Sequence, residues 1–206
     1  MPSDSRSEST RDRIIGAATV EFADHGIGAA RIDRIAKAAK TSKERVYAYF
    51  RSKEELYRFV SARELDAVAE ATRLDPADLP AYAGRLHDYF VEHPHSRRLM
   101  RWGELELSST DDTARETARR KTVVLREAQH NGLIDPTWDP LDVLVFVNRL
   151  ASAWVDQPGL PSIDTDAGAA FSAARRQAIV DAVERLFPVG GPPAQTTDSD
   201  ASSASS

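Results

Sequence analysis

The 206-residue sequence contains no cysteine. Disulfides, thiolate metal sites and cysteine nucleophiles are therefore excluded, which is compatible with a reducing cytoplasm. No apolar run approaches the ~20 residues that a helix needs to span a bilayer. The N-terminal segment also lacks the hydrophobic stretch of a signal peptide. We therefore expect a cytoplasmic protein without a membrane partner.

The alternating apolar pattern of β-strands is also missing. The sequence also lacks the Gly-x-Ser-x-Gly elbow, the phosphate-binding loop and the zinc-binding helix motif. With 41% hydrophobic and 29% charged residues, the composition is that of an ordinary globular protein. The sequence thus predicts an all-α protein with no catalytic residues, cofactor or metal. An enzyme with a catalytic C-terminal domain stays an alternative, because serine, histidine and aspartate are all present.

Residues 32–57 have the pattern of two short helices and a tight turn, followed by the start of a third helix. Apolar residues recur at helical spacing in the first segment. Thr41 and Glu44, three apart, form a capping-box pattern that begins the second helix at Ser42. The same pattern begins the third helix after Ser52.

The charge of this segment is opposite to that of the whole chain. Residues 31–58 contain nine lysines and arginines but only four aspartates and glutamates, whereas the full chain has a net charge of −5. A positive patch on an acidic protein is typical of a nucleic-acid contact. A major groove about 12 Å wide admits one such short helix.

The segment resembles the N-terminal domain of the TetR family of bacterial transcriptional regulators over residues 11–60. The matching residues are Phe22, Gly26, Ile35, Ala36, Ala39, Ser42, Lys43, Tyr47, Phe50 and residues 52–56. The resemblance implies an N-terminal three-helix helix-turn-helix DNA-binding domain and a C-terminal helical domain that binds a ligand and dimerises. It also implies a ligand-responsive repressor that binds a palindromic operator in double-stranded DNA as a homodimer. A small-molecule effector would release it.

We expect DNA contacts from residues of the helix-turn-helix, although a solvated charged face or a DNA-coating protein without sequence preference are alternatives. Lys43 and Arg45 are candidates for contacts to guanine edges. The resemblance implies that Tyr47 and Lys53 bind phosphates. The predicted DNA-binding residues are Arg31, Thr41, Ser42, Lys43, Glu44, Arg45, Tyr47, Tyr49 and Lys53.

Two residues depart from the family pattern. Arg31 stands where many relatives have a capping Thr or Ser; it cannot cap through an oxygen, but it can bind a phosphate strongly. Lys40 stands where relatives usually have Gly. A non-glycine residue in the left-handed conformation costs about 1 kcal/mol or more. Lys40 therefore indicates either an altered turn or a further phosphate contact.

The chain divides into four predicted parts: a disordered tail over 1–10, the DNA-binding domain over 11–58, the ligand-binding and dimerisation domain over 59–187, and a disordered tail over 188–206. The first helix is expected to run from about Ser9 or Thr10 to residue 25, before Gly26. Further helices are expected at about 53–73, 79–92, 94–107, 112–131, 140–155 and 165–187.

The resemblance implies a ligand cavity in the C-terminal domain, and such cavities are mostly apolar with a few polar groups. Core packing or solvent exposure is the alternative for each residue. We interpret His87, His93 and His95 as exposed histidines at a helix junction rather than metal ligands. The predicted ligand-binding residues are His87, Phe90, Trp102, Glu104, Phe146, Asn148 and Arg149.

The last two predicted helices have more apolar surface than a small domain needs, and small residues at spacing four would let two helices approach closely. Two-fold symmetry is the commonest oligomer symmetry, while core packing within the monomer is the alternative. The predicted interface residues are Leu141, Leu144, Phe171, Ala174, Ala178, Ile179, Ala182, Val183 and Leu186.

Overall fold

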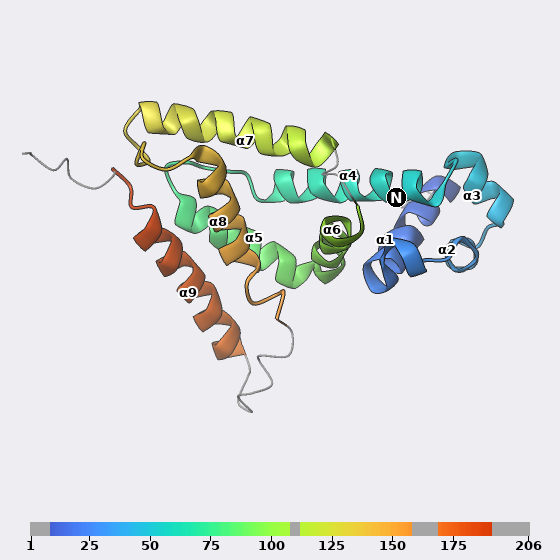
Figure 1. The fold of residues 1–206 in the computed structure, drawn as a ribbon. Helices are drawn as coiled ribbons and strands as arrows, with labels where there is room; N and C mark the ends of the chain where they lie inside the picture. Colours follow the sequence, from blue (N-terminus) through green and yellow to red (C-terminus); the bar gives the residue numbers. More distant parts are fainter. Residues whose placement is uncertain (1–8, 108–111, 158–168, 191–206) are drawn as a thin grey trace, which may run out of the picture.

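The computed structural model describes residues 9–107, 112–157 and 169–190, and these residues form helices joined by short turns (Figure 1). The all-α prediction is confirmed. In chain order the helices are α1 (Thr10–Ala29), α2 (Ile32–Ala38), α3 (Lys43–Tyr49), α4 (Lys53–Ala71), α5 (Leu79–Glu92), α6 (Pro94–Glu106), α7 (Asp112–His130), α8 (Pro140–Ser152) and α9 (Ala169–Leu186).

Helices α1, α2 and α3 and the first turns of α4 form a small unit, which we call the head. Its core consists of buried apolar side chains from all four helices, and Leu99 of α6 completes it. The ring of Phe22 meets that of Tyr57 edge-on, with centroids 5.3 Å apart. Edge-to-face packing of this kind is a favourable aromatic geometry.

Helix α4 leaves the head and runs into a second unit, the body, made of α5, α7, α8 and α9 (Figure 1). A separate apolar core there joins Val68 of α4 to buried residues of α5, α7, α8 and α9. Helix α9 packs along α5, and α8 packs on both α5 and α7. Helix α6 lies between the two units and packs mainly on α1.

Most helix ends follow from local sequence signals. The Ser52 hydroxyl accepts from the Glu55 amide at 3.0 Å and starts α4, as predicted. The other capping prediction is shifted by one residue. Ser42, not Thr41, caps α3 by accepting from the Arg45 amide at 3.2 Å, so the helix begins at Lys43.

The first helix extends beyond its predicted end. Gly26 takes a positive φ of 73°, as a helix-ending glycine does, but helical structure resumes after it and continues to Ala29. The helix begins at Thr10, as predicted, although the predicted tail over 1–10 includes this residue. The Ser9 side chain caps the helix by accepting from the Asp12 amide at 3.1 Å. Helix α8 ends at Ser152, earlier than expected.

The predicted tails over 1–8 and 191–206, and the predicted start of the last helix at 165, lie outside the described residues. Within the described ranges, none of the helices is both long and apolar enough to cross a membrane.

Candidate nucleic-acid interface and ligand cavity

Helix α3 is a short, exposed helix fixed to the head by two anchors. The side chains of Val46 and Phe50 are buried beneath it, and Ser42 closes its N-terminus. The remaining positions, Lys43, Glu44, Arg45, Tyr47, Ala48 and Tyr49, are exposed. A rigid support with side chains projecting from one short helix is what groove recognition requires.

The phenols of α3 stand out, because large aromatic side chains are usually buried. Tyr47 is 43% exposed and Tyr49 is 38% exposed. The guanidinium of Arg45 lies over the Tyr49 ring at 5.6 Å, which limits the motion of both side chains. These three residues are exposed donors on one short helix, and such donors suit base edges and phosphates.

The turn before α3 keeps the geometry that a glycine would allow. Lys40 has φ 52°, which makes it the non-glycine residue with positive φ among the described residues. The Thr41 amide donates to the Ala36 carbonyl at 2.9 Å, and the Lys40 amide to the Lys37 carbonyl at 3.2 Å. This pair of bonds is a Schellman motif with lysine in the left-handed position. The alternative of an altered turn is therefore wrong.

Two of the expected DNA contacts have partners within the head. The ammonium of Lys53 donates to the carbonyls of Gly28 and Ala30, at 2.9 and 3.3 Å, so this lysine ties the end of α1 to the start of α4. Lys43 pairs with Asp33 at 3.2 Å, and both side chains are largely exposed. Exposed pairs of this kind contribute little stability and exchange readily for a phosphate.

Glu44 is placed at the helix cap. Hydrogen bonds from its own backbone amide and from the Ser42 hydroxyl lower the pKa of this carboxyl, and Lys43 adds to the effect. The carboxylate is thus held at the positive end of α3, where a negative charge is favourable. This position is consistent with a role in the cap, while a contact from Glu44 to a DNA base stays a prediction.

Sequence inspection missed Glu21, a buried carboxylate that joins α1 to α2. It accepts from the Arg31 amide at 2.8 Å and from the Arg34 guanidinium, whose closest nitrogen lies 2.6 Å away. Arg31 makes no side-chain cap, as predicted; its amide is satisfied by Glu21 instead. A glutamate on the otherwise apolar face of α1, beside Phe22, is the signal that could have identified it.

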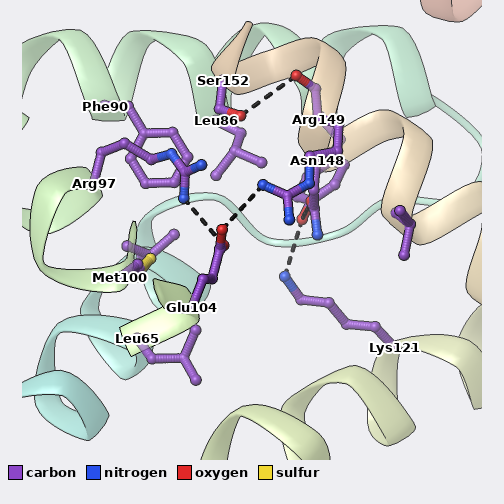
Figure 2. A pocket seen from close by; sticks show the side chains of 13 residues that line it. Leu65, Leu86, Phe90, Arg97, Met100, Glu104, Lys121, Asn148, Arg149 and Ser152 are labelled. Carbon is purple, nitrogen blue, oxygen red and sulfur yellow. Dashed lines mark hydrogen bonds and ion pairs between the residues drawn. The ribbon is translucent and has the colours of Figure 1, made fainter. Parts of the chain in front are cut away.

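The body contains a cavity of about 230 Å³ between five helices, α4 to α8 (Figure 2). Buried side chains such as Tyr82, Leu86 and Phe90 form its floor, while the exposed Glu104 and Arg149 mark its mouth. The lining residues are Leu65, Val68, Tyr82, Leu86, Phe90, Arg97, Met100, Glu104, Lys121, Val145, Asn148, Arg149 and Ser152. An apolar wall with a few polar groups is the usual composition of a small-molecule site.

Polar side chains cross one end of the cavity. Glu104 accepts from Arg149 at 3.1 Å and from Arg97 at 3.4 Å, so it lies between the two guanidinium groups (Figure 2). The Lys121 ammonium donates to the Tyr82 hydroxyl at 2.9 Å, and that hydroxyl donates to Asn148 Oδ1 at 3.3 Å. Ion pairs and hydrogen bonds thus hold this end of the cavity in a defined arrangement.

Four of the predicted ligand residues line this cavity: Phe90, Glu104, Asn148 and Arg149. The other three lie elsewhere. The prediction that His87 is exposed is wrong: it is buried within α5 against the Ala151 carbonyl, with its Nδ1 3.0 Å from the oxygen. The Trp102 indole donates to the Ala23 carbonyl at 3.1 Å.

Phe146, the third, is exposed and meets Trp138 edge-on. The sequence-based list omitted Arg97, Lys121 and Tyr82, which come from three different helices. The packing of these helices brings the three side chains together, so no local sequence pattern predicts their proximity.

The chain is similar to known proteins over both the head and the body. Residues 14–60 match the bacterial regulatory proteins of the tetR family, and residues 78–185 match the tetracyclin repressor-like C-terminal domain. The second match alone spans more than half of the chain. The chain belongs to the TetR family.

Individual relatives support the same assignment. The HTH-type transcriptional repressor SCO4008 of Streptomyces coelicolor is 33% identical over 183 residues, which cover 87% of this chain and 95% of that protein. The crystal structure of SCO4942 from the same organism, described as a transcriptional regulator, is 53% identical with a TM-score of 0.78. That match covers 87% of this chain and 99% of the other.

A TetR family transcription regulator from Marinobacter aquaeolei VT8 shares the fold at 24% identity, with a TM-score of 0.67 over 92% of this chain and 100% of that one. Because the chain belongs to the TetR family, it is a DNA-binding transcriptional regulator.

Helix α6 connects the cavity of this TetR-family protein to its head, because it presents a different face to each. Arg97, Met100 and Glu104 face the cavity. On the other face, Leu99 is buried in the head core, and Glu106 accepts from the Gly28 amide at 2.7 Å. A shift of α6 would therefore change the packing of the cavity wall and of the head core together.

The predicted interface residues of this TetR-family chain divide into two groups. Leu144, Ile179 and Val183 are buried in the core of the body, where their side chains cannot reach a partner. Leu141, Ala174, Ala178 and Leu186 are exposed on α8 and α9, Ala182 is partly exposed, and Phe171 packs edge-on against Trp154.

Two histidines near the start of α6 have ordinary surroundings. His93 stacks on Tyr89 with ring centroids 4.3 Å apart, and its Nδ1 lies 3.0 Å from the Tyr89 carbonyl. His95 lies 3.8 Å from Asp24. Within the described part of the chain, no three potential ligands come together as a metal site.

Proposed function

We propose that this TetR-family protein is a ligand-responsive repressor that binds a palindromic operator as a homodimer and is released by a small molecule in the α4–α8 cavity. The observation that carries the proposal is the exposed group on α3. Arg45, Tyr47 and Tyr49 project from a capped helix whose other face is anchored in the head core. The similarity to SCO4008, a transcriptional repressor, supports repression rather than activation.

Further cations surround α3 and suit the sugar-phosphate backbone. Arg31, Lys37 and Lys40 are exposed, and none of the ion pairs among the described residues involves them. Phosphate contacts fix the register of a protein on the duplex, whereas contacts to base edges specify the sequence. We therefore assign sequence recognition to α3 and positioning to α2 and its turn.

The exposed apolar positions of α8 and α9 support the homodimer. Leu141 and Leu186 are 50% and 41% exposed, and the neighbouring alanines of α9 leave its surface flat. A two-fold axis through such a surface gives a self-complementary interface. Two heads related by that axis would meet two half-sites of a palindrome ~34–36 Å apart.

Helix α6 supports the release mechanism. A molecule that enters the cavity must displace or contact Arg97, Met100 or Glu104, and the same helix carries Leu99 and Glu106 into the head. To invert a 99:1 preference for the DNA-binding form, the effector must favour the other form by about 5.5 kcal/mol.

A binding assay with matched variants tests this function. Fluorescence anisotropy would compare a duplex from upstream of the protein's own gene with a scrambled duplex of equal length and composition. The wild type is expected to prefer the first duplex, and Arg45→Ala or Tyr47→Ala to lose at least about tenfold in affinity. Arg126→Ala, which removes an exposed arginine from α7, is the control and should bind normally.

The same assay separates the alternative of a DNA-coating protein. Such a protein would bind both duplexes equally, with an affinity that follows salt concentration alone. Equal affinity for the two duplexes, unchanged by Arg45→Ala, would contradict the proposed function.

A further inference from the structure

The charges around the cavity do not balance. Among the described residues, Arg97, Lys121 and Arg149 contribute three positive charges to the cavity wall. Only two carboxylates pair with them, those of Glu104 and Asp156. One positive charge therefore remains without a counter-charge beside a partly apolar space.

Arg97 is not the unbalanced group. Its side chain is only 7% exposed, and it donates two hydrogen bonds to Asp156, at 2.9 and 2.6 Å. Burial acts to lower the pKa of Arg97, but the hydrogen bonds and charge of Asp156, with those of Glu104, raise it above the ordinary value. A bidentate pair of this kind satisfies the guanidinium, and the Asp156 carboxylate also lies 3.6 Å from Arg101, so it has no charge left for Lys121.

Glu104 and Arg149 also compensate each other. The Arg149 guanidinium lies 3.1 Å from Glu104 at the mouth of the cavity. Because Glu104 already contacts two guanidinium groups, a positively charged ligand would have to displace one of them. The one carboxylate on the cavity wall thus disfavours a cation.

Lys121 is the unbalanced group. No carboxylate lies within ion-pair distance of its ammonium among the described residues, and the hydrogen bond it makes is to the neutral Tyr82 hydroxyl. An ammonium has three donors, so two remain for another partner. Figure 2 shows its side chain extending toward Asn148, whose amide is a further donor at the same end.

We infer that the effector is a small organic anion, with a carboxylate head that binds Lys121 and the Asn148 amide and an apolar body that packs on Leu86, Phe90 and Met100. A half-buried lysine without a counter-ion favours an anion strongly, because the medium around it screens charge less than water does. The volume of about 230 Å³ limits the body to roughly one ring or a short chain. This inference rests on the proposed effector role of the cavity.

A matched series of ligands on the full chain tests the inference. Phenylacetate, phenylethanol and phenylethylamine have the same aromatic body with an anionic, a neutral and a cationic head. Isothermal titration calorimetry is expected to show phenylacetate binding at least about tenfold more tightly than the other two.

Variants of the chain identify the residue responsible. Lys121→Met keeps the apolar stem and removes the charge, so the preference for phenylacetate should disappear, whereas Lys121→Arg should retain it. Arg126→Met removes a positive charge from the same helix outside the cavity and should leave the preference unchanged. A circular-dichroism melt of each variant verifies that it folds.

The outcomes separate this inference from the proposed function. Tighter binding of the amine or alcohol, no binding of any of the three, or a preference that survives Lys121→Met would overturn the anionic effector. Operator release by phenylethylamine would do so while leaving the proposed function intact. If phenylacetate binds through Lys121 but leaves the protein on its operator, the site chemistry stands and the effector role fails.

Discussion

The hydroxyl of Tyr57 in the head donates a buried hydrogen bond to the carbonyl of Leu99 in α6, at 2.7 Å. The two residues are 42 positions apart, and the bond fixes the start of α4 against α6. Gly103, one turn further along α6, makes the approach possible, because a Cβ there would lie 2.6 Å from the same hydroxyl oxygen. Together with the bond from the Gly28 amide to Glu106, this contact joins the head to α6, one of the helices that line the cavity.

The first prediction concerns this contact. Gly103→Ala should destabilise the protein by about 1–3 kcal/mol, because the buried Tyr57 ring has to move. Chemical denaturation measures the change. Gly16→Ala is the control: nothing lies within 4 Å of its added Cβ, and alanine in an exposed helix should stabilise by up to ~1 kcal/mol.

A double-mutant cycle isolates the pair. Tyr57→Phe removes the hydroxyl and should cost about 1–2 kcal/mol by itself, since the Leu99 carbonyl loses its buried partner. In that background Gly103→Ala should cost clearly less than in the wild type. Additive costs would show that the glycine is not required by Tyr57.

A second prediction concerns acid stability through Glu21. Although burial acts to raise the pKa of this carboxyl, hydrogen bonds from Arg34 and from the Arg31 amide outweigh it and lower the pKa below 4.5. A lowered folded-state pKa gives stability that is present above the unfolded value and lost as pH falls through the folded value.

Glu21→Gln should therefore be less stable than the wild type by about 1–3 kcal/mol at neutral pH. The difference should shrink below about pH 4. Urea denaturation of both proteins at the two pH values measures it. A difference that stays constant into acid would assign the effect to packing rather than to charge.

The third prediction concerns Lys40. Its φ of 52° costs a lysine about 1–2 kcal/mol, which glycine avoids at some cost in unfolded-state entropy. Lys40→Gly should thus stabilise the protein by up to ~1 kcal/mol. If the lysine binds a phosphate, as we expect, the same variant should weaken operator binding and flatten its salt dependence by about one ion per subunit. Unchanged DNA affinity would remove Lys40 from the interface.

The fourth prediction concerns the homodimer. Ala178 lies exposed on α9 between the exposed Ala174 and the partly exposed Ala182. Ala178→Arg puts a long charged side chain where two helices should meet, and it should shift the protein from dimer to monomer in analytical ultracentrifugation. Ala67→Arg, at an exposed position on α4, should remain dimeric. A wild type that sediments as a monomer would contradict the interface directly.

The sequence predicted the head far better than the body. Helix caps, the turn and the anchors Val46 and Phe50 depend on neighbours in the chain, so local patterns contain most of the information. The role of Glu21 was not predicted because its partners, Arg31 and Arg34, lie at the start of another helix, α2. The left-handed geometry at Lys40 was not predicted, because a lysine in place of glycine is equally compatible with an altered turn.

The cavity could be predicted only in part. Its lining comes from five helices, and the meeting of Lys121 with Tyr82 is decided by packing that no local period encodes. The same holds for the interface. Leu144 and Val183 lie on the apolar faces that were predicted to meet a partner, but their side chains are buried in the core of the body. Amphipathic spacing identifies an apolar face without saying which neighbour covers it.

A footprint on the promoter of the protein's own gene tests the central claim most directly. The account predicts two protected half-sites, related by inverted symmetry and centred about one helical turn apart, on one face of the duplex. Both should disappear together with Arg45→Ala. Protection that extends evenly along the fragment, or a pattern that Arg45→Ala leaves unchanged, would contradict recognition by paired α3 helices.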